Sequence, residues 1–133
     1  MIMKLPLLLL LLFSLVACDA DLVEQEVFLS DLLVNCWNHS HEEDKTSDIN
    51  IFRPCDDRDF PISRFRKSID IRPDGTVTYL VLSPIDAHYT EEGIWAYDAL
   101  SQILEIKDPQ GKIHLSKKVI MLDESILELK EVP

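Results

Sequence analysis

Apolar and polar side chains alternate with a period of two along much of this 133-residue chain, and no other feature constrains its fold as strongly. Successive side chains of a strand point to opposite faces, so this alternation predicts a sheet with one buried and one wet face. The clearest example runs over residues 65–71 and returns over 77–81. Between them lie Pro73, Asp74 and Gly75, which favour a tight turn, so the sequence predicts a β-hairpin here.

Similar short runs, separated by turn residues, predict further strands over residues 34–41, 51–53, 93–97, 103–107, 113–121 and 126–132. One helical turn is expected over 28–33, capped by Ser30. No helical stretch is long enough for a crossover, so the strands should be antiparallel. The expected fold class is all-β: a small antiparallel up-and-down meander of about eight strands that forms a barrel or partial barrel, because closure removes exposed sheet edges. A two-layer β-sandwich is the alternative.

The first 17 residues have a different character. Lys4 is followed by an apolar run over 7–13 and by Leu15, Val16 and Ala17 directly before Cys18. This order resembles the signal peptide of bacterial lipoproteins, which is cut before a cysteine whose thiol has been acylated. The run is too short for a transmembrane helix, which needs about 20 apolar residues. The expected organisation is a signal peptide over 1–17, a lipidated tether over 18–28 and a β domain over 29–133.

Lipidation at Cys18 predicts the location of the chain. Acyl chains such as palmitate contribute about 0.8 kcal/mol per buried methylene, so two or three hold a protein durably on a bilayer. We therefore expect a lipid-anchored protein of the cell envelope that faces the periplasm. Asp19 resembles the signal that retains lipoproteins on the inner membrane of enteric-type bacteria, which favours that membrane.

Cys36 and Cys55 remain once Cys18 is acylated. An exported location is oxidising, so a disulfide between them is expected, and it would close a loop of about 20 residues. The alternative is two reduced thiols, Cys36 in the core and Cys55 in a loop.

The chain is strongly acidic. Its formal net charge is −11, and removal of the leader, with one lysine and no acidic residue, makes it −12. Such a surface repels nucleic acid and anionic headgroups, so nucleic acid is not an expected partner.

Several motifs together resemble the small bacterial lipocalin-like proteins of unassigned function. They are Trp37, Ser40 with Glu42 and Glu43, the run Phe52–Arg53–Pro54, the segment 60–66, the turn Pro73–Asp74–Gly75, Gly93 with Trp95, and the final run 127–129. The resemblance implies a small barrel or partial barrel and no particular reaction.

Candidate ligand-binding residues are the aromatic Trp37, Tyr79 and Trp95, which would line a pocket, and Arg64 and Arg66 at its mouth. The alternative is that the aromatic residues fill the core and the arginines form ion pairs with Glu42 and Glu43.

His39, His41 and His88, with Asp86, are weak candidates for a metal site, because residues two apart on a strand share a face but no third ligand has diagnostic spacing. No catalytic constellation or cofactor motif is present, so an enzyme is not expected. The sequence thus favours a membrane-tethered, non-enzymatic protein that binds a small apolar or amphipathic molecule. A structural lipoprotein with a filled core, contacting an envelope protein, is the alternative, and metal binding comes third.

Overall fold

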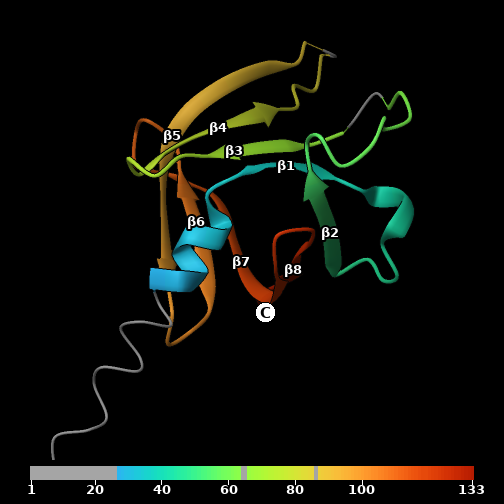
Figure 1. Cartoon of the computed structure of the whole chain (residues 1–133). Coiled ribbons are helices and arrows are strands. Elements are labelled where there is room, and N and C mark those ends of the chain that lie inside the picture. Colours follow the sequence, from blue (N-terminus) through green and yellow to red (C-terminus); the bar gives the residue numbers. More distant parts are fainter. Residues whose placement is uncertain (1–26, 64–65, 86) are drawn as a thin grey trace, which may run out of the picture.

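The computed structural model describes residues 27–63, 66–85 and 87–133. Cys18 and the proposed signal peptide lie outside these residues. The described chain forms eight antiparallel strands that close into one barrel, which confirms the all-β prediction and excludes the sandwich (Figure 1). The strands are β1 (Cys36–His39), β2 (Ile49–Pro54), β3 (Ser68–Ile71), β4 (Thr76–Val81), β5 (Tyr89–Asp98), β6 (Ile103–Lys107), β7 (Ile113–Leu122) and β8 (Leu127–Glu131).

The order of the strands follows the up-and-down prediction from β3 to β8 and departs from it at the start. β1 lies between β2 and β3, and β2 pairs with β8 to close the barrel. The connection over residues 55–67 makes this order possible, because a segment of that length can extend about 40 Å, whereas a six-residue strand spans about 20 Å. A short hairpin loop would have forced β2 and β3 to be neighbours.

The hairpins of the meander follow their turn residues. In the β3–β4 turn Gly75 has φ +87°, and the carboxylate of Asp74 accepts hydrogen bonds from the backbone N–H and the hydroxyl of Thr76. Asp98, Asp108 and Asp123 accept backbone N–H groups in the three later turns in the same way. These are the Asx turns that short aspartate-containing loops favour.

Gly93 pairs with Val77 of β4 and directly precedes Ile94, where the pairing of β5 with β6 begins. Figure 1 shows β5 as a strongly bent strand. A Cβ at this position would overlap the carbonyl oxygen of Lys107. Glycine is therefore needed at this corner of the barrel, because only a residue without a side chain lets the two backbones approach so closely.

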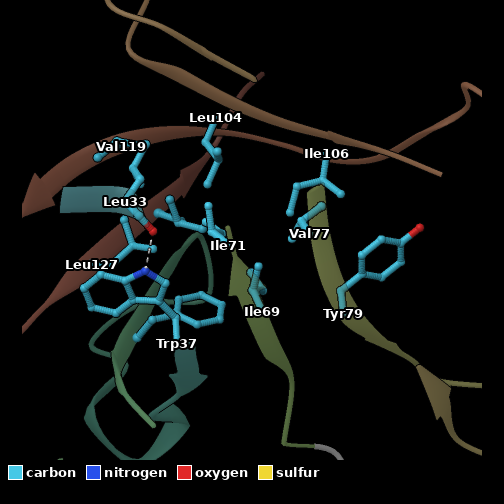
Figure 2. Packing of buried hydrophobic residues seen from close by; sticks show 12 residues of the cluster. Leu33, Trp37, Ile69, Ile71, Val77, Tyr79, Leu104, Ile106, Val119 and Leu127 are labelled. Atoms are coloured by element: carbon cyan, nitrogen blue, oxygen red, sulfur yellow. Dashed lines mark hydrogen bonds between the residues drawn. The ribbon is translucent and has the colours of Figure 1, made fainter. Parts of the chain in front are cut away.

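One end of the barrel is filled. A helix over residues 27–33 precedes β1, and its Leu33 is fully buried in the core cluster. The indole Nε1 of Trp37 donates a hydrogen bond to the carbonyl oxygen of Leu33 at 3.0 Å (Figure 2). The helix begins before Ser30, so the predicted capping role is wrong: the Ser30 hydroxyl instead donates back to the carbonyl oxygen of Val27. We call this end of the molecule the closed end.

The predicted disulfide is present and links Cys36 to Cys55, with the two Cα atoms 5.4 Å apart. Cys36 begins β1 and Cys55 directly follows β2, and the backbone N–H of Cys55 donates to the carbonyl oxygen of Cys36 at 2.9 Å. The bridge therefore fastens the β1–β2 hairpin at the closed end. No helix among the described residues is long and apolar enough to cross a membrane.

Candidate ligand-binding site

A cavity of about 490 Å³ opens at the opposite end of the barrel, which we call the mouth. At the mouth β1, β4 and β8 end while β2, β3 and β7 begin. The apolar walls of the cavity include Phe52, Ile69, Tyr79, Val81, Ile106 and Leu115. Its polar lining consists of Asn50, Lys67, Ser68, His114, Ser116, Lys117 and Glu131. The cavity thus combines an apolar interior with a polar rim, which is the usual composition of a small-molecule site.

Two pairs of stacked rings contribute to the walls. The rings of Tyr79 and His114 lie 4.0 Å apart with an interplanar angle of 21°. The ring of Phe52 stacks on His39 at 5.1 Å with an angle of 28°. Phe52 comes from β2 and Tyr79 from β4, so aromatic surface reaches the cavity from two separate strands.

His114 reaches the cavity because β7 is irregular. Ile106 pairs with Leu115, but Lys107 pairs with Ile113, so His114 is an extra residue without a partner across the ladder. Such a β-bulge redirects a side chain that regular alternation would place elsewhere. A second bulge in β7 skips Ile120, between Val119 and Met121.

A chain of hydrogen bonds runs along one side of the rim. The ammonium of Lys117 donates to the Asn50 side-chain oxygen and to Glu131, each at 2.6 Å. The Asn50 amide donates to Asp44 at 3.4 Å, and Asp44 also interacts with His39 Nε2 at 2.8 Å. These contacts fix the Lys117 charge, so this part of the rim is already satisfied before any ligand binds.

Lys67 stands apart from this chain. It directly precedes β3, and its backbone carbonyl accepts the N–H of His39 at 2.9 Å. Its side chain is exposed at the cavity, and no carboxylate within the described ranges forms an ion pair with it. Among the residues that the structure describes, Lys67 is thus the cavity-lining cation that no ion pair holds.

Burial shifts the pKa values of the rings at the mouth. It raises the pKa of Tyr79 to about 12, with a further contribution from Glu91, whose carboxylate accepts the Tyr79 hydroxyl at 3.3 Å. Burial also lowers the pKa of both His39 and His114, and the nearby charge of Lys67 acts in the same direction on both. These shifts favour the uncharged forms of the three rings, so the lysines are the main source of positive charge at the rim.

The three predicted pocket aromatics have different positions. Tyr79 lines the cavity. Trp37 is fully buried at the closed end, where its indole is held by Leu33, and it does not line the cavity. Trp95 also lies away from it, because its indole Nε1 donates to the carbonyl oxygen of Arg72 at 2.8 Å. Figure 2 shows Trp37 and Tyr79 on different sides of the core cluster.

Of the two predicted mouth arginines, Arg66 does not line the cavity. Arg66 forms a two-pronged ion pair with Glu42 and also donates to the backbone carbonyls of His39 and Pro61. The ion pair lowers the pKa of Glu42 to about 2. Arg64 lies outside the described residues. The Arg66 side chain thus joins Pro61 and Glu42 to the end of β1.

A second ion pair joins Arg53 to Glu43, with hydrogen bonds of 2.8 and 2.9 Å. Glu43 belongs to the short 3₁₀ helix η1 (His41–Glu43), and the hydrogen bonds from Arg53 lower the pKa of this carboxyl to about 2. Arg53 also donates to the carbonyl oxygen of Ser125 in the β7–β8 turn. Together the two pairs form the structural lattice that was the alternative to a binding role.

The candidate metal ligands do not converge. His39 is almost buried and paired with Asp44, whereas His41 lies in η1 with its ring 5.8 Å from that of His39. His88 belongs to the loop before β5, and Asp86 lies outside the described residues. Within residues 27–63, 66–85 and 87–133, no group of three histidine, cysteine or acidic residues is placed to hold a metal ion.

The sequence did not point to Lys67, His114 or Lys117 as site residues. Alternation alone could have placed Phe52 inside the barrel. The polar residues lie at the mouth for two other reasons: the bulge in β7 redirects His114, and others stand where strands begin or end. Neither feature can be recognised from alternation. Comparisons with known protein families, curated proteins and solved structures return no match to this chain.

Proposed function

We propose that this chain is a non-enzymatic binding protein, built on a lipocalin-like barrel, that takes up a small amphipathic molecule at the barrel mouth. The observation that carries the proposal is the cavity of about 490 Å³, whose size lies within the range of ligand sites and whose apolar interior meets a polar rim. Its function is then to hold a molecule, because the polar groups at the rim resemble a set for orienting a ligand more than a set for proton transfer or nucleophilic attack.

The proposal includes a membrane tether. The leader over residues 1–17 and Cys18 support attachment through acyl chains, and the described barrel begins only a few residues later, at the helix over 27–33. The binding site would then be held close to a bilayer of the envelope. Labelled palmitate should enter the wild-type protein and not the Cys18→Ser variant; equal labelling of the two would refute the tether.

Native mass spectrometry of the full chain, released from nanodiscs, tests ligand binding. We expect a small molecule to accompany the wild-type protein purified from its own host. Val81→Trp, which places a large ring in the cavity, should abolish that added mass. Leu100→Trp is the matched control, because Leu100 is exposed in the β5–β6 turn, away from the cavity. An adduct that persists in Val81→Trp would locate binding elsewhere.

A structural role on the envelope is the second candidate. The solid packing of the closed end and the exposed apolar side chains of Ile94, Ile120 and Met121 favour it. If the wild-type protein carries no small molecule under the same conditions, this second candidate becomes the better account.

A further inference from the structure

The shape of the cavity and the charge of its rim restrict the kind of molecule that fits. We infer that the ligand is a compact, ring-bearing organic anion, with its ring against Tyr79 and Phe52 and its acidic group at Lys67. This inference rests on the proposed binding function and adds the class of ligand to it.

The depth of the cavity argues for a compact ligand. The part of the core that does not line the cavity is filled by fully buried side chains such as Trp37, Leu104 and Leu127. A long extended acyl chain needs the length of the barrel interior, which these side chains occupy. A molecule with one or two rings requires only the mouth half.

The walls argue for a ring. The rings of Phe52, Tyr79 and His114 all line the cavity, and Phe52 and Tyr79 are each stacked on a histidine that fixes their orientation. Aromatic groups prefer offset or edge contacts with other rings, which contribute about 0.5–1.5 kcal/mol beyond the area they bury. Walls that are already held in place lose little entropy when such a ligand binds.

The rim argues for an anion. Two lysines and one glutamate belong to the cavity lining, whereas the carboxylates of Glu91 and Asp44 lie just outside it. Glu131 is already paired with Lys117, whereas Lys67 has no ion-pair partner in the part of the chain that the structure describes. An acidic ligand group at Lys67 would supply that partner.

Calorimetric titration of the full chain in phosphatidylcholine nanodiscs tests the inference, with empty nanodiscs as the blank. The probes are 3-phenylpropanoate, its uncharged amide and palmitate. We expect the phenylpropanoate to bind about fivefold more tightly than the amide, the factor that one ion pair near a surface contributes. Palmitate should bind more weakly than phenylpropanoate once its partition into the empty nanodiscs is subtracted.

Two variants locate the acidic group. Lys67→Gln should remove the preference for the acid over the amide, and Lys67→Arg should keep it. Lys118→Gln, which makes the same change of charge on an exposed residue outside the cavity lining, should leave the preference intact. Loss of preference in Lys118→Gln would show that the effect is one of overall charge and overturn the assignment to Lys67.

The outcomes separate this inference from the proposed function. Equal binding of acid and amide overturns the anionic ligand and leaves a binding site in place. Tighter binding of palmitate overturns the compact ligand in the same way. Binding of none of the three probes overturns the inference, and the proposed function is then decided separately by the mass of the molecule that accompanies the wild-type protein.

Discussion

Removing the disulfide gives the sharpest quantitative test of the fold. The bond joins residues 19 positions apart, and opening it frees a loop of that length in the unfolded chain. The chain-entropy relation assigns about 3 kcal/mol to a loop of this size. The double variant Cys36→Ser/Cys55→Ser should therefore keep the barrel and lose about 3 kcal/mol in its free energy of unfolding.

The native contacts around the bridge support the expectation that the barrel survives. Trp37 still pairs with Pro54, and the hydrogen bond from the Cys55 N–H to the carbonyl of residue 36 does not involve sulfur. The loss should therefore come from the unfolded chain, which gains freedom when the loop is open.

Urea unfolding followed by circular dichroism and tryptophan fluorescence measures the effect. With a denaturant slope of about 1.5 kcal/mol per molar, the midpoint should fall by about 2 M while the slope changes little. Wild-type protein in excess reductant has the same open loop, so its midpoint should match that of the double variant. A double variant as stable as the oxidised wild type would refute the loop-closure reasoning.

Three further predictions follow from other features. Gly93→Ala should lower the free energy of unfolding by about 1–3 kcal/mol, because its Cβ would overlap the backbone of the neighbouring strand; an unchanged melting temperature would contradict this. Trp37→Phe should cost about 1–3 kcal/mol in urea unfolding, since the buried carbonyl of Leu33 loses its donor, and a neutral result would show that the hydrogen bond contributes nothing. The lowered pKa values of His39 and His114 mean that the unfolded chain binds more protons below about pH 6.5, so stability should fall as the pH drops from 7.5 to 5.5. A flat profile over that range would contradict the pKa directions.

Local patterns in the sequence predicted much of the fold. The β3–β4 hairpin follows directly from alternation on both sides of Pro73, Asp74 and Gly75, and β6 has the bounds that its alternation indicates. The disulfide follows from the count of cysteines and the expected compartment. These features depend on residues close together in the chain or on a choice between few partners, so the sequence contains enough information to predict them.

The order of the first strands depends on a different kind of information. Whether β2 lies next to β3 or next to β8 is decided by tertiary pairing, and the polar segment over residues 55–67 is compatible with both. In β7 the two bulges break the alternation, so the pattern over 113–121 does not reveal which side chains face inward. The candidate site was predicted only in part for the same reason: its polar rim depends on those bulges and on where the strands end.

The predictions for Trp37 and Trp95 show why aromatic residues are difficult to assign. Each indole lies on a strand at a plausible inward position, but each has a nitrogen donor that must be satisfied when buried. In both cases the acceptor is a backbone carbonyl remote from the mouth, on Leu33 and Arg72. Each indole therefore points toward its acceptor carbonyl and away from the mouth. The residues next to each tryptophan in the sequence do not indicate where that acceptor lies.

The position of β1 and β2 in the barrel has a consequence for how the chain folds. The strands from β3 to β8 pair with their neighbours in sequence, so they can form one hairpin at a time. By contrast, β2 pairs with β8, as in the pair Ile49 and Lys130, which are about 80 residues apart in the sequence. We expect the first hairpin to be synthesised early and docked last, closing both free edges of a six-stranded sheet in one slow step. Until that step the sheet edges stay open to other chains, so a version that ends before β8 should aggregate rather than remain as a smaller barrel.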